Sequence, residues 1–184
     1  MKFTELAIPD VVLIEPEVHG DERGFLFESY HQRKYADGGI DAIFVQDNHS
    51  RSKRGILRGL HAQIARPQGK LVRVVQGEVF DVAVDIRRGS PTFGKHVSAL
   101  LSAENFNQLW IPVGFAHGFC VTSESAEFEY KCTDFYDPAS QLIVRWDDPA
   151  IGIDWPVKDP LLSERDRSAE RLSEVNDMLP LYEG

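Results

Sequence analysis

Residues 71–87 have the sequence LVRVVQGEVFDVAVDIR, which is typical of two short β-strands. In the second half, the even positions from 80 to 86 are all apolar, whereas the odd positions 81, 85 and 87 carry charged side chains. A period of two predicts a strand that buries one face and exposes the other. The apolar residues 71–75 predict an earlier strand, and Gln76-Gly77 predicts a hairpin between the two.

Further short strands, separated by turn residues, are expected at 95–101, 108–112, 114–122, 127–135 and 142–146. A turn near 123–126 predicts a second hairpin, with His117, Phe119, Tyr130 and Cys132 on one face. Helical patterns are confined to 29–36, before Gly38-Gly39, and to short capped turns from Ser163 and Ser173. We therefore predict an all-β antiparallel jelly roll with a few short peripheral helices. No repeat or linker divides the chain, so residues 1–184 are expected to form one domain.

The overall composition is that of an ordinary globular chain, with 42% hydrophobic and 27% charged residues and a net charge of −9. No apolar run is long enough to span a membrane, and the N-terminus lacks the apolar core of a signal peptide. Cys120 and Cys132 are the only cysteines and form no Cys-x-x-Cys pair. These features predict a cytoplasmic protein without disulfides or a membrane partner.

A basic segment, residues 51–73, interrupts this acidic chain, with seven Lys and Arg and no Asp or Glu. Such a segment concentrates positive potential and favours a small anionic ligand. A nucleic acid is not expected as a partner, because the rest of the surface would repel it. Charge alone fits a solvated basic strand equally well.

Within this segment, His61 is the candidate general base, because its ordinary pKa suits proton transfer near neutral pH. Gln63, two residues on, is a poor metal ligand, and no carboxylate follows before Glu78, so we predict no metal. Lys70 has the parity of Val72, which predicts an inward ammonium that needs an anion. A structural strand histidine and an ordinary strand-end lysine are the alternatives.

Several motifs, in order between about residues 8 and 166, together resemble the dTDP-4-dehydrorhamnose 3,5-epimerase family of cupin jelly rolls. They are Arg58-Gly59-Leu60-His61, Gln68-Gly69-Lys70, Gly77-Glu78-Val79-Phe80-Asp81-Val82, Gly89-Ser90-Pro91-Thr92-Phe93-Gly94, Trp110-Ile111-Pro112 and Gly114-Phe115-Ala116-His117-Gly118-Phe119. The resemblance implies a cupin-type antiparallel jelly roll, or double-stranded β-helix. It also implies a homodimeric enzyme, free of metal and cofactor, that acts on a dTDP-4-keto-6-deoxy-hexose. The implied reaction converts dTDP-4-dehydro-6-deoxy-D-glucose to dTDP-4-dehydro-L-rhamnose, in dTDP-L-rhamnose biosynthesis.

The resemblance implies four catalytic residues: His61 as the base, Asp166 as its orienting carboxylate, Tyr130 as the proton donor and Lys70 near the keto oxygen. Local sequence offers simpler explanations for two of them. Asp166 follows Ser163 by three residues, as in a helix first turn, and Tyr130 fits an ordinary sheet aromatic.

The implied substrate-binding residues are spread along the chain. Arg23 and Glu28 are expected to reach the ligand across the dimer, Tyr136 to stack on the base, and Arg165 to meet a phosphate. The remaining implied contacts are Gln46, Asp47, Asn48, Arg58, Lys70, His117 and Gln141. In a regular strand Arg58 and His61 would face opposite sides, so we predict a bulge at Gly59.

Three positions depart from the family pattern: Ala62 and His19 stand where an aromatic is common, and Gln141 where glutamate is common. These changes concern the shape of the pocket and the nucleotide site. They leave open an enzyme that epimerises one carbon only, for another deoxysugar pathway, or a related ketoisomerase. A non-catalytic sugar-binding cupin is the alternative from a different functional class.

Overall fold

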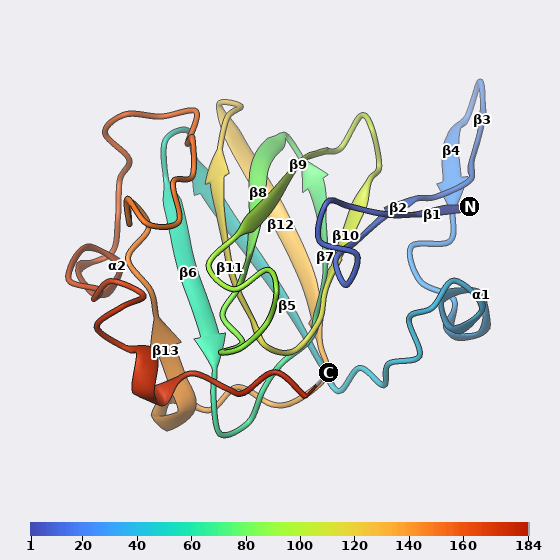
Figure 1. Cartoon of the computed structure of the whole chain (residues 1–184). Coiled ribbons are helices and arrows are strands. Elements are labelled where there is room, and N and C mark those ends of the chain that lie inside the picture. Colours follow the sequence, from blue (N-terminus) through green and yellow to red (C-terminus); the bar gives the residue numbers. More distant parts are fainter. Residues whose placement is uncertain (184) are drawn as a thin grey trace.

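The computed structural model describes residues 1–183 and contains two antiparallel sheets that face each other (Figure 1). The six-stranded sheet has the order β1 (Lys2–Glu5), β2 (Val12–Glu15), β10 (Gln108–Ile111), β7 (Lys70–Gln76), β12 (Ser125–Cys132) and β5 (Gln46–Lys53). The five-stranded sheet has the order β13 (Gln141–Ile143), β6 (Leu57–Gln63), β11 (Phe115–Val121), β8 (Glu78–Asp85) and β9 (His96–Ser102). The predicted all-β antiparallel jelly roll is confirmed.

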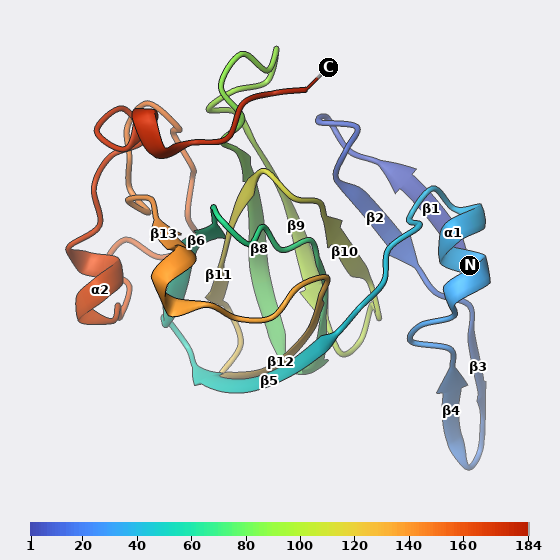
Figure 2. The same cartoon turned by 90° about the horizontal axis from the view of Figure 1, so that it is seen from below.

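The remaining elements are short and lie around the two sheets. A hairpin of β3 (Val18–Asp21) and β4 (Gly24–Phe27) extends away from the sandwich in both views (Figure 2). The helices are α1 (Gln32–Asp37), α2 (Glu164–Arg167), η1 (Pro138–Ser140) and η2 (Asn176–Met178). α2 lies on the opposite side of the sandwich from the β3–β4 hairpin. No helix in residues 1–183 has the length and hydropathy needed to cross a bilayer.

The two predicted hairpins are wrong, although their strands exist. β7 and β8 belong to different sheets, so the turn at Gly77 carries the chain from one sheet to the other. β11 and β12 are likewise divided between the sheets. A short turn fits either connection, and the choice is made by strands far away in the sequence, because β12 pairs with β5 and β7 instead.

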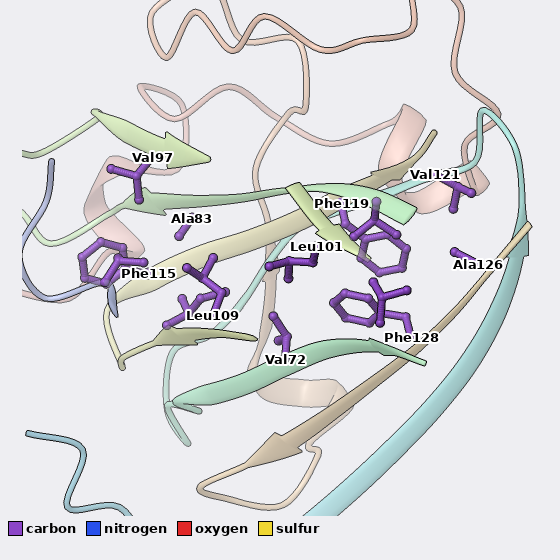
Figure 3. Close-up of a cluster of buried hydrophobic side chains, with 14 of the residues drawn as sticks. Val72, Ala83, Val97, Leu101, Leu109, Phe115, Phe119, Val121, Ala126 and Phe128 are labelled. Atoms are coloured by element: carbon purple, nitrogen blue, oxygen red, sulfur yellow. The ribbon is translucent and has the colours of Figure 1, made fainter. Parts of the chain in front are cut away.

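The expectation that β8 exposes one face is also wrong, because both of its faces are buried. The even face, with Val82 and Val84, packs beneath the C-terminal segment, including Trp155 and Leu172. The odd face, with Val79 and Ala83, belongs to the core cluster inside the sandwich, where Figure 3 shows Ala83. The charged side chains on this face therefore point into the interior, which makes them candidates for function.

The core between the sheets is built from alternate residues of facing strands. Phe119 of β11 stacks on Phe128 of β12, with ring centroids 4.2 Å apart (Figure 3). Val72 and Leu109 of the six-stranded sheet face Leu101 of the five-stranded sheet within the same cluster. Apolar packing of this kind fixes the separation of the two sheets, and the site lies where polar side chains replace it.

Candidate active site

A cavity of about 280 Å³ contains most of the predicted catalytic residues. Its lining comes from both sheets and from the segments that join β6 to β7 and β12 to β13. The lining residues are Gln46, Asn48, His61, Ala62, Gln63, Gln68, Lys70, Tyr130, Tyr136 and Gln141. A second cavity of about 340 Å³ shares His61 and Gln141 with the first and adds Arg58, Arg165 and Asp166. His61 therefore lines both cavities.

The predicted bulge at Gly59 is confirmed. The pairing of β6 with β11 shifts by one residue, since His61 lies opposite His117 whereas Arg58 lies opposite Phe119. Gly59 has a φ of 135°, and a Cβ there would lie 2.5 Å from the Cα of Gly118. Only glycine fits both the backbone conformation and the close approach. The bulge lets Arg58 and His61 line the same cavity.

His61 and Asp166 form the closest polar pair of the site. The Nε2 atom of His61 lies 2.5 Å from Oδ1 of Asp166, whose side chain is almost entirely buried. Ser163 caps α2 by accepting a hydrogen bond from the Asp166 amide, and its hydroxyl donates to Oδ2 of Asp166. The helix cap and the contact with His61 are therefore both present. A carboxylate at Nε2 leaves Nδ1 of His61 available as a base.

Lys70 and Tyr130 supply the remaining polar groups with catalytic potential. The Nζ atom of Lys70 lies 3.5 Å from the carbonyl oxygen of His61. Burial lowers the pKa of Lys70, and nearby Cys132 and Asp81 oppose this shift. Burial also raises the pKa of the Tyr130 phenol, which keeps it protonated and able to donate. The predicted inward orientation of Lys70 is consistent with this position.

His117 lies behind the cavity rather than in its lining. Its Nε2 atom is 3.0 and 3.1 Å from the two carboxylate oxygens of Asp81, which is fully buried. Its ring stacks on Phe128, with centroids 6.0 Å apart. Burial lowers the pKa of His117, and Asp81 opposes this shift. The sequence did not indicate that Asp81 lies beside His117, because the period of two in β8 predicted an exposed face for the odd positions.

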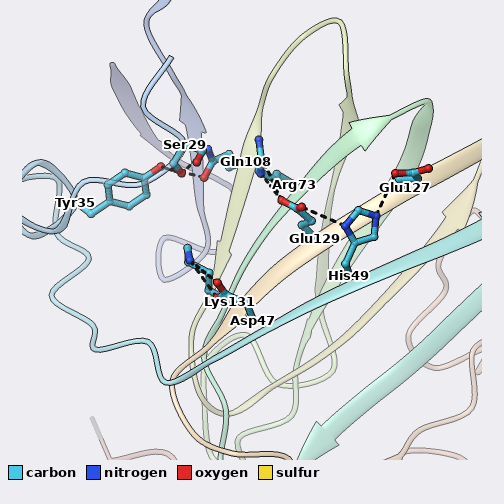
Figure 4. A network of polar contacts seen from close by, with 9 residues as sticks. All are labelled: Ser29, Tyr35, Asp47, His49, Arg73, Gln108, Glu127, Glu129 and Lys131. Carbon is cyan, nitrogen blue, oxygen red and sulfur yellow. Dashed lines mark hydrogen bonds and ion pairs between the residues drawn. The ribbon is translucent and has the colours of Figure 1, made fainter. Parts of the chain in front are cut away.

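The predicted binding residues divide into those that the structure brings together and those that it does not. Gln46, Asn48, Tyr136 and Gln141 line the first cavity, and Arg58 and Arg165 line the second. The side chain of Asp47 lies on the outer face of the sheet, where it pairs with Lys131 at 3.0 Å (Figure 4). Strand alternation explains this position, since Gln46 and Asn48 on either side of Asp47 line the cavity.

Arg23 and Glu28 lie far from His61 within this chain. Arg23 pairs with Asp21 at the tip of the β3–β4 hairpin, and Glu28 pairs with Lys34 of α1. The hairpin extends away from the sandwich, whereas α2, which carries Asp166, lies on the other side (Figures 1 and 2). Their predicted contact across a dimer stays a prediction.

The cavity lining also includes side chains that the sequence did not single out as site residues, chiefly Gln63 and Gln68. Gln63 shares the parity of His61 on β6, which is the one signal that could have indicated it. In residues 1–183 no cluster of three or more His, Cys, Asp or Glu side chains is arranged to hold a metal ion.

Comparison with known proteins gives consistent matches over nearly the whole chain. A family model described as dTDP-4-dehydrorhamnose 3,5-epimerase matches residues 5–174. The dTDP-4-dehydrorhamnose 3,5-epimerase of Pseudomonas aeruginosa is 61% identical over 178 residues, covering 96% of this chain and 98% of that protein.

Two solved structures are similar in fold as well as in sequence. The dTDP-6-deoxy-D-glucose-3,5-epimerase of Legionella pneumophila, in complex with dTDP-4-keto-L-rhamnose, gives a TM-score of 0.97 at 50% identity, covering 100% of this chain and 99% of that one. A 3′-monoepimerase of Streptomyces bikiniensis, in complex with dTDP-quinovose, gives 0.90 at 34% identity, covering 96% and 92%. The chain therefore belongs to the dTDP-4-dehydrorhamnose 3,5-epimerase family.

Proposed function

We propose that His61, Asp166, Tyr130 and Lys70 carry out the 3,5-epimerisation of dTDP-4-dehydro-6-deoxy-D-glucose to dTDP-4-dehydro-L-rhamnose. As a member of its family, the protein is an isomerase of the epimerase class. The observation that carries the assignment of roles is the pair of His61 and Asp166, beside a cavity that also contains Tyr130 and Lys70. We take residues 1–184 to act as one epimerase domain in dTDP-L-rhamnose biosynthesis.

The chemistry requires a proton to leave a carbon next to the C4 ketone and another to arrive on its opposite face. His61 takes the first proton, and Asp166 stabilises the imidazolium that forms. The electrons of the broken C–H bond move to the keto oxygen as an enolate, which the Lys70 ammonium stabilises. The Tyr130 phenol then protonates the carbon, and the enolate collapses back to the ketone. His61 releases its proton to solvent and Tyr130 recovers one from solvent, so that both groups are restored. The sequence runs once at C3 and once at C5, and no metal or cofactor takes part.

The residues that line the two cavities bind the rest of the substrate in this proposal. Arg58 and Arg165 line the second cavity, where their guanidinium groups suit the diphosphate. Tyr136 lies at the first cavity with half of its surface exposed, as a ring that stacks on a base requires. Gln46, Asn48 and Gln141 offer polar groups to the remainder of the ligand. We expect the enzyme in the cytoplasm, in keeping with its two buried free thiols.

The proposal includes a homodimer, which the position of Arg23 and Glu28 supports. Arg23 lies at the tip of the β3–β4 hairpin, which extends away from its own sandwich, and Glu28 directly follows β4. Strand β4 also exposes Phe25 and Leu26. Exposed apolar side chains on a projecting hairpin favour a protein contact. In the proposed dimer the hairpin of one protomer brings Arg23 and Glu28 to the nucleotide in the site of its partner.

Exchange of substrate protons with solvent tests the reaction directly. In heavy water, we expect the purified protein to incorporate deuterium at both C3 and C5 of the 4-keto sugar. A His61→Ala variant serves as the control and should incorporate almost none. If the wild-type protein incorporates no deuterium at either carbon, the proposed reaction is wrong and a non-catalytic sugar-binding role takes its place.

Epimerisation of one carbon is the second candidate, and similarity to the monoepimerase of Streptomyces bikiniensis supports it. Ala62 lines the cavity beside His61, at a position where a larger side chain would change its shape. The same exchange experiment separates the candidates, because a single-centre enzyme labels one carbon and a double epimerase labels two.

A further inference from the structure

Gln63 is a buried side chain whose amide is fully occupied by the protein backbone. Its Nε2 group donates to the carbonyl oxygen of Arg66 at 2.7 Å and to that of Phe135 at 3.2 Å. Its Oε1 atom accepts from the amide of Asp137 at 2.8 Å. Both N–H bonds of the side chain are thus engaged, and 8% of the residue's surface is exposed.

Two of these three contacts lie on either side of Tyr136. Gln63 binds the carbonyl of the residue before it and the amide of the residue after it. The amide of Tyr136 itself donates to Oε1 of Gln46 at 2.8 Å. Tyr136 lies between β12 and η1, outside any strand, so these side chains replace the ladder that would otherwise fix its backbone.

We propose that Gln63 is a positioning residue for Tyr136: it fixes the two peptide groups that flank this tyrosine and so holds the ring at the cavity mouth where the ligand's aromatic base stacks. This inference rests on the proposed stacking role of Tyr136. Gln63 does not bind the ligand itself, because its polar atoms are committed to the backbone. Its effect is on affinity for the base, whereas proton transfer depends on His61 and Asp166.

The residue type fits this role closely. A carboxylate at position 63 would accept from Asp137 but would repel the two carbonyl oxygens. An aliphatic side chain of similar length would leave all three backbone groups without this partner. Only an amide offers two donors and one acceptor in the required arrangement.

Binding of dTDP, compared with inorganic pyrophosphate, tests the inference. In Gln63→Met, we expect affinity for dTDP to fall between about fivefold and a hundredfold, the range for one lost base–aromatic stack. Affinity for pyrophosphate, which has no base, should stay within about twofold of the wild-type value, because Arg58 and Arg165 are unaffected. With the sugar substrate, KM should rise while kcat stays close to that of the wild-type protein.

A double-mutant cycle separates positioning of Tyr136 from general damage to the site. In a Tyr136→Ala background, Gln63→Met should cause little further loss of dTDP affinity, because the ring that it positions is already absent. The inference is overturned if Gln63→Met binds dTDP like the wild-type protein, if it weakens pyrophosphate equally, or if its full effect persists in the Tyr136→Ala background.

Two further measurements decide the matter if Gln63→Met does not fold. Gln63→Glu retains the acceptor for Asp137 and loses both donors, and the same criteria apply to it. In the wild-type protein, the Asp137 amide should be protected from hydrogen exchange although it lies in a loop; rapid exchange there would contradict the contact. Failure of the proposed epimerisation would appear separately, as a wild-type protein that labels no carbon in heavy water.

Discussion

The Nε2 atom of His61 lies 2.5 Å from Oδ1 of Asp166, so a strand histidine and an aspartate 105 residues later form one pair. Replacing Asp166 with asparagine keeps the shape of the side chain but removes the charge that stabilises the imidazolium. We expect kcat to fall by roughly 10²- to 10⁴-fold with little change in KM, as for loss of general-base function. Steady-state kinetics of Asp166→Asn measure this directly.

Glu164→Gln is the matched control, because Glu164 lies in the same helical turn, is exposed and does not contact His61. It changes the charge near the N-terminus of α2 by the same amount. Its kcat should stay within about twofold of the wild-type value. Equal losses in the two variants would mean that Asp166 acts through the helix rather than through His61.

Tyr130→Phe removes the proposed proton donor and leaves the ring in place. We expect turnover to fall by about 10²-fold or more, because reprotonation on the opposite face then depends on water. Deuterium exchange at one carbon should persist, since His61 can still remove and return a proton on its own face. Mass spectrometry of the substrate recovered from heavy water measures both effects.

Tyr35→Phe provides the comparison for the loss of a buried phenol away from the site. The Tyr35 hydroxyl donates to Oε1 of Gln108 at 2.9 Å, and burial raises its pKa in the same direction as for Tyr130. This variant should unfold more easily, by roughly 1 kcal/mol, with kcat unchanged. If Tyr130→Phe behaves in the same way, Tyr130 is a structural aromatic.

The fold class could be predicted from local patterns, but the pairing of strands could not. The period of two in β8 identifies a strand, yet the same period gives no sign that Asp81 faces a second sheet. Gly77 has a φ of 77°, which suits a hairpin turn as well as a connection between sheets. Contacts with distant strands decide between them.

For the same reason, only some residues of the candidate site could be predicted from the sequence. The parity of Lys70 indicated an inward side chain, and the cations around His61 indicated an anion site. The sequence around Asp166 indicates only the first turn of a helix. Its pairing with His61 was predicted from the family resemblance alone. Gln63 carries none except its parity with His61, because its partners lie in two loops that only the fold brings together.

The pH dependence should report the environment of Lys70. Burial lowers its pKa below the ordinary value of about 10.4, so its ammonium loses the proton at a lower pH than an exposed lysine would. If that charge stabilises the enolate, kcat should decline on the alkaline side before pH 10.4. Asp81 opposes the shift, so Asp81→Asn should move the decline to lower pH still. Profiles of kcat against pH measure both.

Asp85→Asn is the control for this effect, since Asp85 is a second fully buried aspartate of β8. Its carboxylate binds Arg87, Ser90 and Thr92, and it is not among the charges that act on Lys70. We expect Asp85→Asn to lower the free energy of unfolding but to leave the alkaline decline of kcat at the same pH. If the alkaline decline of kcat shifts equally in Asp81→Asn and Asp85→Asn, it does not report the titration of Lys70.

Gly59→Ala should disrupt the bulge that aligns Arg58 with His61. The residue has a φ of 135°, and an added Cβ would meet the Cα of Gly118 at 2.5 Å. Backbone strain and overpacking together should lower the free energy of unfolding by roughly 2–5 kcal/mol. Gly55 also has a positive φ, of 77°, but open space around an added Cβ, so Gly55→Ala tests backbone strain alone. It should cost about 1–2 kcal/mol, and denaturant titration compares the two.

Mixing two inactive or weakened variants tests whether the hairpin completes the site of a partner. In the proposed dimer, each site takes His61 from one protomer and Arg23 from the other. A dimer of one Arg23→Ala and one His61→Ala protomer would therefore contain one complete site. After unfolding and refolding an equimolar mixture, random pairing should restore about a quarter of wild-type activity at low substrate concentration.

Mixing His61→Ala with Asp166→Asn is the decisive comparison, because the 2.5 Å contact shows that one chain supplies both residues. In this mixture every site lacks one member of the pair, so activity should not rise above the mean of the two parents. If the Arg23→Ala mixture also stays at its parental mean, Arg23 does not cross to the partner. Its position far from His61 in its own chain would then exclude it from the site altogether.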